Sequence, residues 1–338
     1  MIKTLIVDDS ALVRSVIRNF LESDGSFSVV GEAGNGAEAV ELAQRLNPDL
    51  ITMDIEMPVM NGLEAIVEIK KIMATAIVVI TSHSSAKTAY QATVKGALEF
   101  YPKEIFTSNA GGQNQREVLD TLKRITGIKQ RLPVAPASSA QNARIEPRRI
   151  LAIVIAASTG GPKALSRLCP ALPKNFPVPI ILVQHNSPGF DLGFAQWLDD
   201  CAPLRVRLAE ERAIPASGNL YVAPTDRHLA FGKNGFLFDD GEPVNNQKPA
   251  ADVLFKSAAE TYGDALASVV LTGMGCDGAE GTRHVKQAGG ITIAQDEATS
   301  LVYGMPRAAA ETGCVDLTLP LETIAGQLAA FAKWGEQK

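Results

Sequence analysis

Short apolar runs separated by amphipathic segments occupy the first third of the chain. The segments at residues 11–22 and 63–72 repeat apolar positions every three to four residues, which predicts helices. Strands and helices that alternate in this way form a parallel sheet with helices on both faces. We therefore expect an α/β domain with a five-stranded parallel sheet at residues 1–126. Its predicted strands are residues 2–7, 28–31, 50–53, 76–80 and 98–101.

A second series of apolar runs begins near residue 150. Residues 150–157, 180–184 and 269–276 each contain or precede Gly or Pro at their ends, which is typical of buried parallel strands. Residues 204–247 instead contain several Gly and Asn turn signals and predict short antiparallel strands. We expect a doubly wound α/β domain at residues 149–335 that includes a β-hairpin region.

The segment between the two domains, residues 127–148, differs from both. It lacks apolar periodicity and is rich in Pro, Ala, Ser and Gln, so we interpret it as a semi-flexible linker.

Composition places the chain among globular proteins. Of its 338 residues, 46% are hydrophobic and 20% are charged, as in ordinary α/β proteins. Its apolar runs are shorter than the roughly 20 residues of a membrane span, and Asp8 and Asp9 follow the start too closely for a signal peptide. Four cysteines are scattered without CxxC spacing. We expect a reduced, cytoplasmic protein with no structural zinc and no membrane insertion.

The formal charge of −5 lies in the second half of the chain. Residues 150–338 contain 15 Lys and Arg and 20 Asp and Glu, whereas residues 1–149 contain 17 of each. An acidic domain matches a nucleic-acid backbone poorly, so we expect no nucleic-acid partner.

Polar residues end several strands of the first domain. Asp8 and Asp9 follow the first strand, Asp54 follows the third, Thr81 ends the fourth, and Lys103 follows the fifth. The carboxyl ends of parallel strands meet at one edge, so these groups converge there. A single strand-end acid is commonly a solvated loop residue, but this set suits Mg²⁺ binding and phosphoryl capture on Asp54.

This part of the chain, about residues 1–126, resembles the receiver domain of two-component response regulators. The resemblance implies that Asp54 is the phospho-acceptor and that Asp8 and Asp9 bind metal. It implies a switch formed by Thr81 and Phe100. The motifs that carry it are Asp8-Asp9-Ser10, residues 53–58, Asn61-Gly62, Thr81, and Gly96-Ala97 before Lys103.

One position departs from the usual receiver pattern. That family usually has Pro directly after the lysine, whereas here Pro102 precedes Lys103 and Glu104 follows it.

The turn after the first apolar run of the second domain carries candidate chemistry. Ser158 is followed by Thr159, Gly160 and Gly161, which allow a sharp turn, and by Pro162, which suits a first helical turn. A hydroxyl at the head of a helix can act as a nucleophile, because free N–H groups stabilise an oxyanion there. A phosphate-binding loop is the alternative, although GxGxxG, GxxxxGK[ST] and GxSxG are all absent.

Two further residues complete a possible nucleophile–base–acid relay. His185 alone among the four histidines follows a predicted parallel strand, and Asp277 follows the run at 269–276. Ser158, His185 and Asp277 would meet at one sheet edge and form a relay for acyl transfer. Taken singly, His185 could cap a helix or bind backbone, and Asp277 could be a helix N-cap. Cys276 has no basic neighbour that would activate its thiol.

Residues 150–330 resemble the catalytic domain of the chemotaxis protein-glutamate methylesterase (CheB) family. The resemblance implies Ser158 as nucleophile, His185 as general base and Asp277 as its orienter. It places Thr159 and the backbone N–H of Met274 at the oxyanion, and Asn186-Ser187 stand where the family usually has Met-Pro. The motifs are residues 157–161, 184–185 with 188–190, 271–275 with 277–279, 295–300 with 303–306, 221–224 and 252–255.

The two resemblances together imply a hydrolase that is activated by phosphorylation of Asp54. It would release methanol from glutamate γ-methyl esters of methyl-accepting chemoreceptors and deamidate some receptor glutamines, with no cofactor for the esterase chemistry. A chemotaxis histidine kinase would supply the phosphoryl group. The contrasting hypotheses are a non-catalytic regulator, a general esterase of small metabolites and, against the charge, a DNA-binding regulator.

Overall fold

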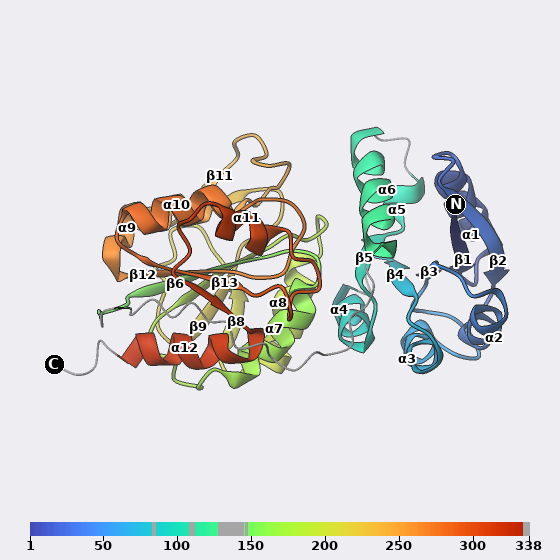
Figure 1. Cartoon of the computed structure of the whole chain (residues 1–338), viewed down its shortest axis with the longest axis horizontal. Helices are drawn as coiled ribbons and strands as arrows, with labels where there is room; N and C mark the ends of the chain where they lie inside the picture. The colour runs from blue at the N-terminus through green and yellow to red at the C-terminus, as the bar shows by residue number, and fades with distance from the viewer. Residues whose placement is uncertain (83–85, 108–111, 128–144, 146–147, 334–338) are drawn as a thin grey trace. The chain divides into compact units, whose positions relative to one another are not determined.

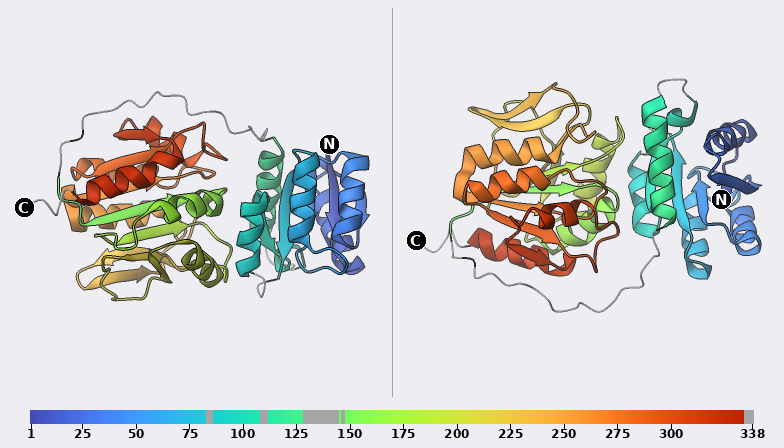
Figure 2. Two further views of the ribbon diagram at one scale, coloured as in Figure 1. Left: turned by 90° about the horizontal axis from the view of Figure 1, so that it is seen from below. Right: turned by 45° about the horizontal axis from the view of Figure 1, so that its top comes forward.

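The structure, a computed structural model, describes residues 1–82, 86–107, 112–127, 145 and 148–333. It divides into two compact units, Met1–Arg131 and Leu132–Lys338 (Figures 1 and 2). The expected linker at residues 127–148 lies almost wholly outside the described residues. Among the helices described, none combines the length and apolar character that crossing a membrane requires.

The first unit contains a five-stranded parallel sheet in the order β2-β1-β3-β4-β5, which confirms the expected α/β fold. Helices α1, α5 and α6 cover one face, and α2, α3 and α4 cover the other (Figure 1). In chain order the elements are β1 Ile2–Val7, α1 Ala11–Glu22, β2 Phe27–Ala33, α2 Gly36–Leu46, β3 Leu50–Met53, α3 Gly62–Ile72, β4 Ala76–Thr81, α4 Ala86–Lys95, β5 Glu99–Pro102, α5 Glu104–Thr107 and α6 Gly112–Thr126.

Local sequence explains how α3 begins beside the third strand. Asn61 caps the helix, and Asn61 and Glu64 form a reciprocal capping box. A side chain on Gly62 would place its Cβ 2.0 Å from the carbonyl oxygen of Asp54. The Asn61-Gly62 pair therefore both starts α3 and lets its first turn pack directly against the backbone of Asp54.

The second unit contains a seven-stranded parallel sheet in the order β14-β13-β12-β6-β7-β9-β8. Helices α7, α8 and α12 lie on one face, and α9, α10 and α11 lie on the other (Figure 1). The elements are β6 Ala152–Ala157, α7 Gly161–Leu168, η2 Cys169–Ala171, β7 Ile180–Gln184, α8 Asp191–Cys201, β8 Arg205–Leu208, β9 Asn219–Val222, β10 His228–Gly232, β11 Gly235–Asp239, α9 Ala251–Tyr262, η3 Gly263–Ala265, β12 Leu266–Val270, α10 Ala279–Gln287, β13 Ile291–Gln295, α11 Met305–Glu311, β14 Leu317–Leu319 and α12 Leu321–Lys333.

The expectation of antiparallel strands throughout residues 204–247 is correct for only half of that segment. Strands β10 and β11 form the predicted antiparallel hairpin. Strands β8 and β9 are parallel instead, and β9 extends the main sheet beside β7. Gly218 does adopt a positive φ of 73°. Residues 209–218, however, form a connection that returns the chain to the end of the sheet at which β8 begins, so β9 runs in the same direction as β8.

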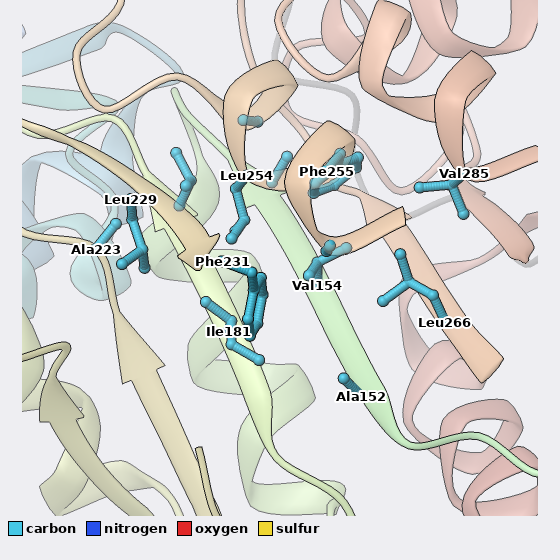
Figure 3. Close-up of a cluster of buried hydrophobic side chains, with 14 of the residues drawn as sticks. Ala152, Val154, Ile181, Ala223, Leu229, Phe231, Leu254, Phe255, Leu266 and Val285 are labelled. Carbon is cyan, nitrogen blue, oxygen red and sulfur yellow. The ribbon is translucent and has the colours of Figure 1, made fainter. Parts of the chain in front are cut away.

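A buried apolar layer holds α9, α10 and the hairpin on the sheet (Figure 3). Leu254 and Phe255 of α9 and Val285 of α10 lie over the strands, with Leu229 and Phe231 of β10 beside them. Burial of each large side chain stabilises the fold by about 1.5–3 kcal/mol. This layer fixes where the amino-terminal end of α9 lies relative to the sheet.

Close packing between α9 and α10 gives a stability prediction at Gly281. A Cβ there would lie 2.5 Å from the Cβ of Phe255, a contact that flexible side-chain atoms cannot relieve. Gly281→Ala should therefore lower the free energy of unfolding of the second unit by about 1–3 kcal/mol, because it overpacks the helix contact.

Tryptophan fluorescence during denaturation measures this effect, because Trp197 is buried in α8 of the second unit and the first 149 residues of the sequence contain no tryptophan. Gly326→Ala in α12 is the matched control, since a Cβ there meets nothing within 4 Å. That change should stabilise the unit by up to about 1 kcal/mol. Equal shifts in the two variants would contradict a close contact at Gly281.

Candidate functional site

The first unit gathers three carboxylates at the carboxyl edge of its sheet. Asp8, Asp9 and Asp54 each place an oxygen within 4.8 Å of the others. Asp8 and Asp54 are buried, whereas Asp9 is exposed. A cluster of carboxylate oxygens with one open side fits a hard divalent cation such as Mg²⁺, which prefers oxygen ligands and retains waters.

Lys103 joins this cluster from the end of β5. Its Nζ lies 2.8 Å from Asp8 Oδ2 and 2.7 Å from Asp54 Oδ2. Its backbone N–H donates to the carbonyl of Thr81, which pairs with Pro102 across the sheet. Pro102, which precedes the lysine, is therefore the last residue of strand β5. Glu104, which follows the lysine, begins the short helix α5.

Burial makes the charge on Asp54 costly. Desolvation raises the pKa of Asp54 above its usual value, and the nearby charge of Asp8 adds to the effect. The hydrogen bond and charge of Lys103 oppose this rise without cancelling it. Burial lowers the pKa of Lys103, but its contacts with the two carboxylates outweigh burial and raise it. A cation at the cluster would relieve the remaining repulsion.

The two expected switch residues lie on adjacent strands of the same sheet. Thr81 ends β4 and is buried. Phe100 lies on β5, buried, with its ring edge-to-face against Tyr90 of α4 at a centroid distance of 4.7 Å.

In the second unit, Ser158 lies on a tight turn directly after β6. Its carbonyl accepts the N–H of Gly161 at 2.7 Å, and Gly160 has φ 79° and ψ −4°. Those angles match the third position of a type II turn, which favours glycine. A Cβ on Gly161 would lie 2.0 Å from Gln184 Oε1 and 2.9 Å from the Cβ of Ala157, so packing also favours glycine at this position. Pro162 falls in the first turn of α7, as predicted.

His185 lies on the neighbouring strand end. Ala157 pairs with Gln184 across the parallel strands, and the N–H of His185 donates to the carbonyl of Ala157 at 3.0 Å. Neighbouring strands are about 4.8 Å apart. Ser158 and His185, which follow the paired residues, are therefore adjacent at the edge of the sheet.

Gln184 ties these two strand ends together, a role that the sequence analysis missed. Its Nε2 donates to the carbonyl of Ser158 at 3.1 Å and to that of His185 at 2.9 Å. The side chain is buried. An amide at the end of an otherwise apolar run, residues 180–183, was the signal in the sequence.

Asp277 reaches His185 from the loop after β12, the strand on the other side of β6. Its Oδ2 lies 2.8 Å from His185 Nε2, and both side chains are buried. A carboxylate accepts, so this contact puts the ring proton on Nε2 and leaves Nδ1 as the basic nitrogen. His185 Nδ1 is buried and has no hydrogen-bond partner among the described residues.

The carboxylate of Asp277 also caps a helix that is distant in sequence. It accepts the N–H of Ala251 at 2.6 Å and that of Asp252 at 3.0 Å, both in the first turn of α9, and that of Gly278 at 3.1 Å. In return, the side chain of Asp252 accepts the N–H of Gly281 in the first turn of α10 at 2.6 Å. The two helices thus exchange carboxylate caps.

These donors determine the charge state of Asp277. Burial alone would raise the pKa of Asp277, but the hydrogen bond and charge of His185 and the N–H groups of Ala251 and Asp252 outweigh burial. The pKa of Asp277 therefore lies below its ordinary value, and the carboxylate stays ionised beside the imidazole.

A buried polar network fixes the loop between β12 and Asp277. The Thr272 hydroxyl donates to the carbonyl of Thr159 at 3.0 Å, and the Thr272 N–H donates to Gln295 Oε1 at 2.8 Å. A Cβ on Gly304 would lie 3.3 Å from the Cα of Met274. Thr159 is buried in the turn after Ser158, and Met274 is half-buried in the loop before Asp277.

The other described histidines lie outside this cluster. His228 is in β10, as expected for a hairpin, and His284 is in α10. His83 falls outside the described residues.

Comparison with known proteins assigns a family to each of the two units. Residues 153–328 match the model of the CheB methylesterase family, and residues 4–109 match that of the response regulator receiver domain. The chain belongs to the CheB methylesterase family. The CheB methylesterase match covers β6 through most of α12 and therefore includes Ser158, His185 and Asp277.

Members of the CheB methylesterase family resemble the chain along nearly its whole length. The protein-glutamate methylesterase/protein-glutamine glutaminase of Pyrococcus abyssi is 40% identical over 342 residues, covering 96% of this chain and 91% of the relative. That of Thermotoga maritima is 39% identical over 336 residues, covering 97% and 98%. The crystal structure of the Thermotoga maritima CheB methylesterase catalytic domain is 41% identical and covers 54% of this chain and 99% of that domain, with a TM-score of 0.53.

The lowered pKa of Asp277 predicts how stability of the CheB methylesterase unit depends on pH. The folded-state pKa lies below the unfolded-state value, so the ionised group stabilises the fold above the unfolded pKa. This contribution is lost as pH falls through the folded pKa. Asp277→Asn should cost about 1.5–3 kcal/mol near pH 7, the loss of a hydrogen-bonded charge, and progressively less below about pH 5.

Denaturation followed by tryptophan fluorescence at several pH values checks this dependence. Asp199→Asn is the control, because an amide oxygen can still accept the N–H of Val206. That variant should change stability little near pH 7, because its hydrogen bond to Val206 is kept. A cost for Asp277→Asn that stays constant down to acid pH would rule out the proposed charge state.

Proposed function

We propose that this chain is a receiver-regulated protein-glutamate methylesterase and protein-glutamine glutaminase, in which Ser158, His185 and Asp277 carry the hydrolysis. The observation that supports it most is the buried contact of 2.8 Å between His185 and Asp277, beside the turn that carries Ser158. Proteins of that name match this chain over more than nine-tenths of its length.

The chemistry begins with attack by Ser158 Oγ on the carbonyl carbon of a glutamate γ-methyl ester. His185 Nδ1 takes the hydroxyl proton and returns it to the methoxy oxygen as the ester bond breaks and methanol leaves. A water then attacks the acyl-serine, with His185 again moving the proton, and releases glutamate. For a glutamine, ammonia leaves in place of methanol.

Asp277 and the surrounding turn stabilise the charges that develop. The Asp277 carboxylate orients the ring of His185 and stabilises its cation. We assign binding of the oxyanion to Thr159 and to the backbone N–H of Met274, as the family resemblance implies. Thr159 follows Ser158 directly, and Met274 follows Gly273, where a Cβ would lie 2.8 Å from the Cβ of Ser158. The helices after β6 and β12 leave on opposite faces of the sheet, the switch point where α/β folds bind ligands.

In the receiver we propose Asp54 as the phospho-acceptor. Mg²⁺ held by Asp8, Asp9 and Asp54 would offset the phosphoryl charge, and Lys103 would contact the new oxygens. Thr81 and Phe100 would then respond to the phosphoryl group, since a modification changes activity only through contacts that differ between two states.

The proposed partners follow from the family, and the proposed domain boundaries follow from the sequence pattern. We propose methyl-accepting chemoreceptors as substrates, a chemotaxis histidine kinase as phosphodonor and a cytoplasmic location. We place the receiver at residues 1–126, a linker at 127–148 and the catalytic domain at 149–335. A short linker keeps the receiver at a high effective concentration beside the catalytic domain.

The nucleophile assignment predicts the effect of Ser158→Ala. Removal of the attacking hydroxyl should reduce methanol release from methylated receptor membranes by about a thousandfold or more. Ser166→Ala in α7 is the matched control, because that hydroxyl only bonds the carbonyl of Lys163 on its own helix. Substantial esterase activity in the Ser158 variant would exclude this serine as nucleophile.

The receiver assignment predicts the effect of Asp54→Asn. In the presence of Mg²⁺ and acetyl phosphate, the wild-type chain should release methanol faster, whereas Asp54→Asn should show no stimulation, because the amide cannot accept a phosphoryl group. Asp24→Asn, which removes a carboxylate paired with Lys123 instead, should keep the stimulation. Persistent stimulation of Asp54→Asn would place the phosphoryl group elsewhere.

A further inference from the structure

Helix α9 begins without a cap of its own. Its N-cap residue is Ala250, which has no side-chain hydrogen-bonding group. The N–H groups of its first turn need partners, because they are buried beside the sheet. Those of Ala251 and Asp252 donate to Asp277, and that of Ala250 donates to Nδ1 of His228 at 3.1 Å.

The surroundings of His228 select one form of its ring. The side chain is buried, with 1% of its surface exposed. Nδ1 must accept, because its partner is the N–H of Ala250, and Nε2 must carry a proton, because it lies 3.0 Å from the carbonyl oxygen of Glu242. Both contacts are made only by the neutral ring protonated on Nε2.

His228 is the first residue of β10, so it links the hairpin to the start of α9. The same hairpin is attached about two turns further along the helix, where the N–H of Phe231 donates to the hydroxyl of Ser257 at 3.1 Å. Apolar contacts complete the attachment, with Leu229 and Phe231 beside Leu254 (Figure 3). Of the two hydrogen bonds, only the one to His228 is made next to the groups that bind Asp277.

We propose that His228 is a positioning residue for hydrolysis. By holding the N–H of Ala250, it orients the next two N–H groups, which keep Asp277 ionised and aimed at His185. This gives the hairpin a role in the reaction without any contact with the substrate. The role rests on the proposed function, because it acts through the same His185–Asp277 pair.

Two amide variants separate the two contacts of the ring. In His228→Asn, the side-chain oxygen falls near the place of Nδ1 and can accept from Ala250. In His228→Gln, the side-chain nitrogen falls near the place of Nε2 and can donate to Glu242, which leaves Ala250 without its acceptor. The proposal predicts that the Asn variant retains most of kcat, whereas the Gln variant loses about tenfold to a hundredfold with KM nearly unchanged.

A spectroscopic measurement tests the same point without a substrate. The proton that His185 shares with Asp277 should give a low-field ¹H NMR signal in the wild-type chain and in His228→Asn, and the signal should be shifted or broadened in His228→Gln. Should wild-type protein show the signal but release no methanol, the proposed substrate would fail while the positioning role stands.

Ser257→Ala is the matched control, because it loosens the hairpin on α9 without changing His228. It should lower stability, measured by tryptophan fluorescence, and leave kcat and the low-field signal unchanged. If His228→Gln does not fold, Ala250→Pro, which deletes the N–H and keeps the ring, replaces it with the same expectations. Equal kcat and equal signals in the Asn and Gln variants, or a loss of kcat in Ser257→Ala as large as that in His228→Gln, would overturn the proposal.

Discussion

The arrangement of the second unit depends on the hydrogen bonds that stabilise one buried carboxylate, that of Asp277. An isolated ionised acid in the interior is strongly destabilising unless hydrogen bonds and an opposite charge compensate it. Asp277 receives these hydrogen bonds from the first turn of α9 and from the imidazole of His185, and the ring supplies the opposite charge when it takes up a proton. The close contact of α9 with α10 at Gly281, and the cap that Asp252 returns to α10, hold the donors in place. Helix packing and the candidate chemistry are thus joined in one set of contacts.

In the receiver, the surroundings of the buried carboxyl of Asp54 shift its pKa in the opposite direction from that of Asp277. Asp54 is desolvated next to Asp8, and a single lysine leaves its pKa raised. For Asp277 the hydrogen bonds outweigh the effect of burial, and the pKa of this carboxyl is lowered. A carboxylate that orients a base should stay ionised and fixed in place. A carboxylate that accepts a phosphoryl group should instead lie where a bound cation can offset the charge that the phosphoryl group adds. The two environments suit these two tasks.

Strand-end positions were predictable from the sequence, but contacts made across the fold were not. Apolar runs placed Ser158, His185 and Asp54 at the ends of parallel strands, and parallel strands share one edge. The sequence around Ala250 contains no capping residue, so nothing local indicated that α9 is capped by Asp277. Gln184 was hidden because a strand-end amide can equally face solvent. Strands β8 and β9 were expected to be antiparallel because turn signals do not reveal at which end of the sheet a chain re-enters.

The most direct test of the account is to locate an acyl-directed fluorophosphonate on the intact chain by mass spectrometry. The account predicts one adduct per chain, mapped to the peptide that carries Ser158, because only a serine beside the His185–Asp277 pair is activated to attack the probe. No adduct on the folded chain, or an adduct at another serine, would contradict it.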